Sequence, residues 1–125
     1  MVPLTGDTTR TLVVDDDELV RTVLRTALER LGHVVAEAGD GEAAIRATGT
    51  DVFDLVIIDS RMPGLSLGET LEGIRAALDP HHPGVLVISG APVAVEVLEE
   101  HGAAYLAKPV DLREFLSAVR LAVAS

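Results

Sequence analysis

The sequence predicts an α/β protein in which a doubly wound, five-stranded parallel sheet carries helices on both faces. Five short and strongly apolar runs of strand length support this fold, at residues 11–14, 33–36, 55–58, 85–88 and 104–107. Such runs are typical of strands that are buried on both faces of a parallel sheet. Segments with helical spacing alternate with these runs, and short connections between strands and helices favour right-handed crossovers.

The helices are predicted from apolar residues at spacings i, i+3 and i+4. The clearest stripe extends from Leu19 to Leu31, and Gly32 follows it as a helix stop. The same pattern predicts four further helices, at residues 40–47, 66–78, 93–100 and 112–123. Gly68 and Gly73 each weaken the second of these by about 1 kcal/mol relative to alanine.

Composition restricts the classes of function that the protein can have. The 125 residues suffice for one domain with its own core. That core is expected to be aliphatic, because the aromatic residues are only Phe53, Tyr105 and Phe115. The formal net charge of −10 argues against direct nucleic-acid binding, since little positive charge is available to neutralise phosphates. The absence of cysteine excludes a disulfide framework and a thiolate metal site.

Residues 1–10 lack the basic start and apolar stretch of a signal peptide. No apolar run approaches the roughly 20 residues that a membrane span needs. We therefore expect a cytoplasmic protein without a membrane partner. Residues 1–10 are expected to form an N-terminal tail and residues 11–125 a single domain, with no output domain after it.

Polar side chains follow four of the predicted strands. They are Asp15, Asp16 and Asp17 after the first strand, Asp59 after the third, Ser89 after the fourth and Lys108 after the fifth. In open α/β sheets, ligands bind just beyond the carboxyl ends of the strands. Clustered carboxylates repel one another unless a cation lies among them, and hard oxygen ligands suit Mg²⁺. The pattern predicts a magnesium site at this edge of the sheet.

Each of these residues also has an ordinary structural explanation. Asp17 can cap the first helix, and Ser89 can cap the fourth. Asp59 can be a turn residue, and Lys108 can be a solvated cation. Because acids, a hydroxyl and an ammonium group follow four strands of one sheet, the combination favours a functional site.

Four sequence runs resemble the receiver domains of two-component response regulators: LVVDDD at 12–17, DLVIIDSRMPG at 54–64, VISG at 87–90 and YLAKP at 105–109. The resemblance extends from Thr11 to Val123. It implies a flavodoxin-like (βα)5 fold with strand order 2-1-3-4-5. It also implies a phosphorylation-dependent signalling switch of a two-component system or phosphorelay. Such a domain is not a conventional enzyme, since it catalyses only its own Mg²⁺-dependent phosphorylation and dephosphorylation.

The resemblance assigns the acceptor and the metal ligands residue by residue. Asp59 would accept a phosphoryl group from the phosphohistidine of a sensor histidine kinase or a histidine phosphotransfer protein. Asp16 and Asp59 would bind Mg²⁺ directly, and Mn²⁺ could substitute for it. Asp15 would hold the ion through water, and the backbone carbonyl of Arg61 would supply a further oxygen.

The resemblance also assigns the residues that respond to phosphorylation. Lys108 would pair with the remaining phosphoryl charge, and the Ser89 hydroxyl would hydrogen-bond a phosphoryl oxygen. Tyr105 occupies the position of an aromatic residue that turns inward when this hydroxyl moves, although a packed ring with a solvated hydroxyl would explain it equally well. Gly90, beside Ser89, would leave the site open to a phosphoryl donor.

The sequence departs from the family at two places. Ser66 and Leu67 stand where the family usually has Asp-Gly, but Ser66 is still a good helix N-cap. Only 19 positions separate Ser89 from Lys108, which is shorter than usual by about one helical turn. We therefore expect a truncated fourth helix that starts near Ala91, with Pro92 in its first turn.

The fourth helix, the fifth strand and the fifth helix form the usual output and dimerisation surface of the family. We expect a downstream protein effector to bind this face. Because the fourth helix is short, the usual dimer is in doubt, and a monomer or weak homodimer is expected. The protein is expected to be either a single-domain regulator or a receiver from a larger protein.

Parts of the sequence are also compatible with two other classes of function. Asp15 and Asp17 satisfy the Asp-x-Asp motif of haloacid-dehalogenase-type hydrolases, but that assignment leaves Asp59 unexplained, and the chain has no room for a cap domain. A receiver-shaped module that acts only through its surface is also possible on fold alone. Such a module would need none of the acids, the hydroxyl or the ammonium group at the strand ends.

Overall fold

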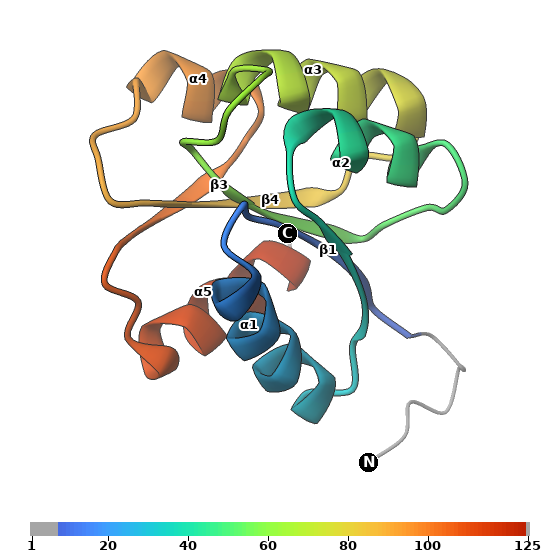
Figure 1. Ribbon diagram of the computed structural model, residues 1–125. Helices are drawn as coiled ribbons and strands as arrows, with labels where there is room; N and C mark the ends of the chain where they lie inside the picture. The colour runs from blue at the N-terminus through green and yellow to red at the C-terminus, as the bar shows by residue number, and fades with distance from the viewer. Residues whose placement is uncertain (1–7, 125) are drawn as a thin grey trace.

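The computed structural model describes residues 8–124, which form a five-stranded parallel sheet between two layers of helices. The strand order is β2-β1-β3-β4-β5, as the resemblance implied. Helices α1 and α5 cover one face of the sheet, and α2, α3 and α4 cover the other (Figure 1). This arrangement confirms the predicted fold class.

All ten predicted elements are present, and their ends lie within two residues of the predicted ranges, although the fourth helix does not start near Ala91. The strands are β1 (Arg10–Val14), β2 (Val34–Ala38), β3 (Leu55–Asp59), β4 (Gly84–Ser89) and β5 (Ala104–Ala107). The helices are α1 (Glu18–Arg30), α2 (Gly41–Thr48), α3 (Leu67–Leu78), α4 (Val95–Glu100) and α5 (Leu112–Ala124). None of the helices in the described part of the chain combines the length and apolarity needed to cross a bilayer.

The predicted N-terminal tail, residues 1–10, lies mostly outside the described residues. Its last residue, Arg10, already belongs to β1, where it is paired with Val34 of β2. The strand therefore begins one residue earlier than the apolar run indicates, because backbone pairing in a ladder does not require an apolar side chain.

Side chains cap the starts of α1, α2, α3 and α5, the last of these through Asp111. Asp17 caps α1 by accepting hydrogen bonds from the backbone amides of Leu19 and Val20, at 2.9 and 3.3 Å. Asp40 caps α2 in the same way. Ser66 caps α3, as predicted, and Glu69 completes a reciprocal capping box with it. These caps satisfy amides that would otherwise lack partners at the helix starts.

Helix α4 begins later than predicted. It starts at Val95 rather than near Ala91, so Pro92 precedes the helix and does not lie in its first turn. Its N-cap residue is Ala94, which makes no side-chain capping bond, so the suggestion that Ser89 caps this helix is wrong. The helix has only six residues.

The expectation that all five strands are buried on both faces holds only for the centre of the sheet. Every residue of β3 is buried, and β1 and β4 are buried except at their first residues. The edge strands β2 and β5 are largely exposed or half-buried. Each edge strand has a neighbour on one side only and is covered less completely by the helices.

The core consists of two aliphatic clusters separated by the sheet. Alternate residues of β1 and β3 supply each cluster, as the two-residue period of a strand requires. Phe53 belongs to the cluster under α2, α3 and α4, and Phe115 to the cluster under α1 and α5. Tyr105, the remaining aromatic residue, is 40% exposed and belongs to neither cluster.

Gly73 allows α2 and α3 to approach each other closely. A Cβ atom at position 73 would overlap Cγ1 and Cδ1 of Ile45 on α2. A Cβ atom at position 68 would meet nothing closer than Oγ of Ser66, at 4.0 Å. The two glycines that weaken α3 by propensity are therefore not equivalent, because only Gly73 has a packing role.

We predict that Gly68→Ala and Gly73→Ala change stability differently. Gly68→Ala gains up to about 1 kcal/mol of helix propensity. Gly73→Ala gains the same propensity but overpacks the contact with Ile45, which typically costs about 1–3 kcal/mol. Urea unfolding of both variants should therefore find Gly73→Ala clearly the less stable of the two. Equal stability of the two variants would contradict the packing role.

Candidate functional site

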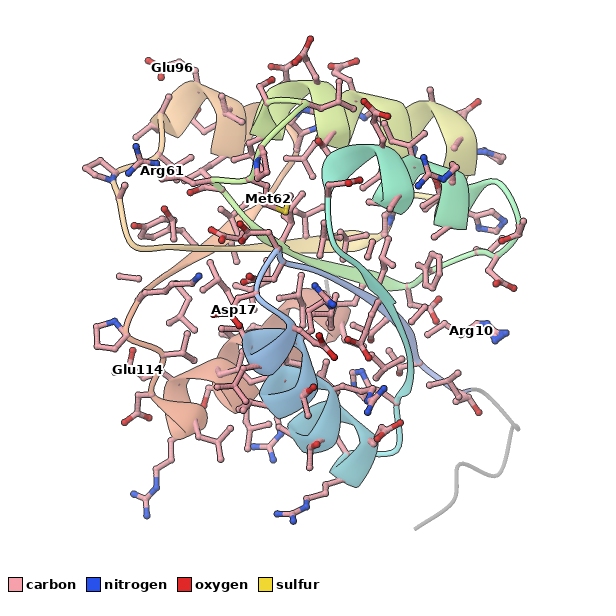
Figure 2. The ribbon with its side chains drawn as sticks, viewed as in Figure 1. Arg10, Asp17, Arg61, Met62, Glu96 and Glu114 are labelled. Carbon is pink, nitrogen blue, oxygen red and sulfur yellow. The ribbon has the colours of Figure 1, made fainter. Side chains whose placement is uncertain are left out.

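The register of the sheet brings the predicted acids together. Val14 of β1 is paired with Ile58 of β3, so Asp15 and Asp59, the residues that follow them, lie side by side at the carboxyl edge. Asp15 is 3% exposed and Asp59 is 9% exposed. Asp17 lies at the start of α1, and Arg61 lies on the loop after β3 (Figure 2). The edge therefore holds two buried carboxylates next to each other.

Lys108 supplies the positive charge between these carboxylates. Its Nζ lies 3.3 Å from Oδ2 of Asp59 and 3.5 Å from Oδ2 of Asp15. The backbone amide of Lys108 donates to the carbonyl of Ser89 at 2.8 Å, which ties the residue to the end of β4. The structure thus brings residues from β1, β3 and β5 to one point.

The protonation of this cluster depends on burial and on charge. Burial raises the pKa of Asp15, although the amide of Asp17 and the charge of Lys108 partly oppose this effect. Burial alone would lower the pKa of Lys108, but the charges of Asp15 and Asp59 outweigh it, so its pKa is raised. The ammonium group is therefore held in its charged form beside the acids.

Asp16 completes a cluster of three carboxylates. One oxygen from each of Asp15, Asp16 and Asp59 lies within 4.8 Å of the other two, and Asp16 is exposed where the other two are buried. A donor set made only of carboxylates suits a hard divalent cation such as Mg²⁺, and the exposure of Asp16 leaves a path from solvent. The residues present therefore fit the metal that the sequence implied.

Arg61 contacts the acceptor through its amide. Its backbone N–H donates to Oδ1 of Asp59 at 3.2 Å. The role expected for the carbonyl of Arg61, as a metal ligand, stays a prediction. Met62, the next residue, packs against the core cluster under α3 and α4 and so anchors this loop (Figure 2).

Ser89 is fully buried and is bonded away from Asp59. Its hydroxyl accepts a hydrogen bond from the Ser60 hydroxyl and donates to the carbonyl of Ala91 at 2.6 Å. The Tyr105 hydroxyl donates to the same carbonyl at 3.3 Å. The two residues predicted to act as a switch therefore share one acceptor, the carbonyl of Ala91, on the loop between β4 and α4.

The sequence analysis missed several residues that hold this site. Nη1 of Arg21 donates to the backbone carbonyl of Asp15 at 2.7 Å, and its Nε donates to Glu37 at 3.1 Å. Arg25 reaches the other carboxylate oxygen of Glu37 at 2.6 Å. Ser60 was also missed. A charged residue on an amphipathic helix resembles an ordinary solvated residue, so no sequence signal distinguished these arginines.

The structure is an α/β domain with a cluster of carboxylates at the carboxyl edge of its parallel sheet, and comparison with known proteins assigns its family. Residues 11–120 match the family model described as the response regulator receiver domain. The chain belongs to this family, and its function as a receiver domain of two-component signalling follows from that membership.

Individual relatives agree with this assignment. The chain is 38% identical over 120 residues to the DNA-binding transcriptional regulator NtrC of Azospirillum brasilense, covering 91% of this chain and 24% of that protein. It is 32% identical to the receiver domain of the hybrid histidine kinase CckA, with a TM-score of 0.78 and coverage of 91% and 98%. A response regulator receiver domain protein from Methanospirillum hungatei JF-1 is 25% identical, with a TM-score of 0.85 and coverage of 94% and 95%. The chain spans about a quarter of the length of the first curated relatives it matches.

We predict that Asp15 makes the fold less stable as the pH rises. The unfolded carboxyl group loses its proton near its ordinary pKa of 3.8, whereas the folded protein keeps the proton to higher pH. Between these two values the folded state binds more protons, so the free energy of unfolding falls as the pH rises. The amide of Asp15→Asn does not titrate, so the free energy of unfolding of this variant, relative to that of the wild type, should increase with pH across this window.

The measurement is urea unfolding of wild type and Asp15→Asn at a series of pH values in metal-free buffer. Asp16→Asn is the matched control, because it removes a neighbouring charge at an exposed position that lacks the burial of Asp15. Parallel pH profiles for wild type and Asp15→Asn would contradict the account of this pocket.

Proposed function

We propose that Asp59 accepts a phosphoryl group from the phosphohistidine of a sensor histidine kinase or a histidine phosphotransfer protein. The observation that carries this proposal is the position of Asp59, buried at the end of β3 with Nζ of Lys108 at 3.3 Å. A carboxylate oxygen of Asp59 forms the new bond to phosphorus as the bond to the histidine nitrogen breaks. The products are an acyl phosphate and a free imidazole.

The residues around Asp59 have separate roles in this transfer. Lys108 is paired with Asp59 before transfer. After transfer it would pair with a phosphoryl oxygen and remain close to Asp15. Arg21, through the carbonyl of Asp15, keeps the acidic loop in place. This positioning places the charged groups before the donor arrives, so little reorganisation is needed during transfer.

Asp15, Asp16, Asp59 and the backbone carbonyl of Arg61 would hold Mg²⁺, with Mn²⁺ as a substitute. The bound ion would shield the acceptor carboxylate and offset charge on the transferring oxygens. Without a cation, the phosphoryl group would approach three carboxylates that lie close together. This repulsion is the reason to expect phosphorylation to depend on the metal.

Phosphorylation would be reported by Ser89 and Tyr105. A phosphoryl oxygen on Asp59 offers Ser89 a charged acceptor, and charge-assisted hydrogen bonds are about twice as strong as neutral ones. Ser89 would leave Ser60 and the carbonyl of Ala91, and this carbonyl also holds Tyr105. The loop before α4 and the ring of Tyr105 would then move together, while the tightly packed core stays unchanged.

The output would pass through the face of α4, β5 and α5 to a downstream protein effector. This face exposes Val95, Tyr105 and Leu112 by 59%, 40% and 53%. We propose that the protein acts in the cytoplasm, and that the short α4 leaves it a monomer or weak homodimer. The same mechanism serves a single-domain regulator and a receiver within a larger protein. Beyond its own phosphorylation and dephosphorylation, the domain would act on no substrate.

The hydrolase alternative is not favoured by the structure. An Asp-x-Asp hydrolase motif would need Asp17 beside Asp15 in the pocket, but Oδ1 of Asp17 accepts two backbone hydrogen bonds as the cap of α1. The family match also assigns the chain to the response regulator receiver domains, not to these hydrolases. The alternative of a module that is never phosphorylated is separated from our proposal by the following experiment.

We predict that acetyl phosphate with Mg²⁺ adds one phosphoryl group to the wild type and none to Asp59→Asn, because an amide is not a competent nucleophile. Asp16→Ala should lose most of the labelling, since it removes an expected metal ligand. Intact-mass spectrometry measures both results, with excess chelator added to a parallel sample of wild type.

Asp54→Asn is the matched control for this experiment. Asp54 precedes β3, and its carboxylate accepts from the amide of Arg10 at 2.8 Å, away from the pocket. It should label like wild type. Undiminished labelling of Asp59→Asn, or full labelling of the wild type under chelator, would overturn the proposal.

We further predict that Ser89→Ala still accepts the phosphoryl group but loses the response at Tyr105. Amide chemical shifts are compared before and after beryllofluoride, a phosphoryl mimic, in wild type, Ser89→Ala and Ser60→Ala. The control Ser60→Ala removes one partner of Ser89 but leaves the Ser89–Ala91 bond, so its response should persist. Shifts of equal size near Tyr105 and residues 91–101 in wild type and Ser89→Ala would show that Ser89 is not the transmitter.

A further inference from the structure

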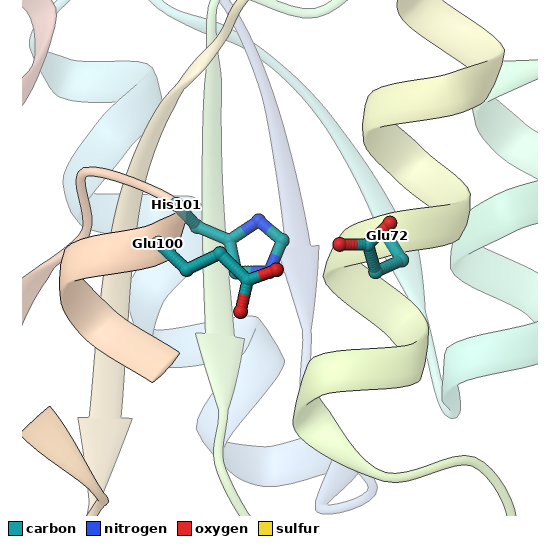
Figure 3. A group of neighbouring side chains, drawn as sticks. All are labelled: Glu72, Glu100 and His101. Carbon is teal, nitrogen blue, oxygen red and sulfur yellow. The ribbon is translucent and has the colours of Figure 1, made fainter. Parts of the chain in front are cut away.

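We propose that Glu72 of α3, with Glu100 and His101 at the end of α4, forms a second metal site that takes a borderline divalent ion such as Zn²⁺. One ligand atom from each residue lies within 4.8 Å of the other two. Figure 3 shows the carboxylate of Glu72 facing the carboxylate of Glu100 and the imidazole of His101 across the gap between the helices. The site is separate from the acidic edge that holds Asp59.

Within residues 8–124, the side chains of Glu72, Glu100 and His101 make no hydrogen bond or ion pair. Arg75 donates to the backbone carbonyl of Glu100 at 3.4 Å and does not pair with either carboxylate. Two negative groups therefore face each other without a paired cation, and a bound metal ion would relieve their repulsion.

A cavity next to Glu100 and His101 gives an ion room for further ligands. It has a volume of about 310 Å³, and its polar lining residues are Arg75, His82, Glu100 and His101, whereas Glu72 lies outside it. Water can complete a four-coordinate site, the geometry that Zn²⁺ prefers.

The donor chemistry separates this site from the acidic edge. Imidazole nitrogen combined with carboxylate oxygen suits Zn²⁺ and similar ions, whereas three carboxylates suit Mg²⁺. A protein with both sites should therefore bind Zn²⁺ even when millimolar Mg²⁺ occupies the acidic edge. This expectation does not depend on phosphorylation at Asp59.

Zn²⁺ at this site would join α4 to α3. Helix α4 has only six residues, and its start lacks a side-chain cap, so a link at its end would restrain the whole helix. The same helix belongs to the proposed output face. A metal ion at Glu100 and His101 would therefore restrain the element that phosphorylation is proposed to move.

The test titrates ZnCl₂ into the wild-type protein by calorimetry in the presence of millimolar MgCl₂. Wild type should bind one Zn²⁺, and His101→Ala and Glu72→Gln should each weaken binding by at least about tenfold. A loss of about tenfold is the smallest effect expected even for a residue that only hydrogen-bonds to a metal ligand. His81→Ala is the matched control, because it removes an imidazole from the same loop as His82 but from outside this cavity. Melting temperatures of the metal-free variants confirm that they are folded.

The result that supports the site is tight binding by wild type, His81→Ala and Asp16→Ala, with loss in His101→Ala and Glu72→Gln. Amide shifts induced by Zn²⁺ should then be confined to residues near 72 and 95–102. Equal affinity of wild type and His101→Ala would overturn the proposal, as would loss of binding in Asp16→Ala, which would place the zinc at the acidic edge.

Discussion

The arrangement of residues at the carboxyl edge of the sheet depends on the free-energy cost of burying two carboxylates side by side. Asp15 and Asp59 lie at adjacent strand ends with little exposure, and burial raises the pKa of Asp15. Lys108 offsets part of this cost, and its own pKa is raised by the acids that it neutralises. Arg21 holds the backbone of Asp15 from the other side. Clustered carboxylates of this kind favour a bound divalent cation, and the added negative charge of a phosphoryl group would make that cation more necessary.

Helix α4 is the element through which the acidic site is proposed to affect the protein surface. The loop before it carries the Ala91 carbonyl, which accepts from Ser89 and from Tyr105. The other end carries Glu100 and His101, which face Glu72 of α3. The helix is short and its start lacks a side-chain cap, whereas the central strand β3 is buried along its whole length. Our two proposals therefore concern opposite ends of α4: phosphorylation at the loop before it, and a metal ion at its last residues.

The sequence predicted the parts of the structure that follow from periodicity. Apolar runs indicate where strands end, so the sequence alone predicts that Asp15, Asp59 and Lys108 lie at one edge of the sheet. The start of α4 could not be predicted from the sequence, because Pro92 suits the first turn of a helix and no capping residue marks Val95 as the true start. The partners of Ser89 were also hidden, since a hydrogen bond between serine side chains depends on how two loops meet. The role of Gly73 comes from helix packing, whereas helix propensity alone predicts only that this glycine weakens α3.

The central claim is that Asp59 alone among the clustered acids becomes an acyl phosphate. The most direct measurement uses unmutated protein that is phosphorylated with acetyl phosphate and Mg²⁺ and then reduced with borohydride. Reduction converts an aspartyl phosphate into homoserine, and tandem mass spectrometry of the peptides locates it. The account predicts homoserine at position 59 and unmodified aspartate at positions 15, 16 and 17. Homoserine at position 15, or at none of these positions, would contradict it.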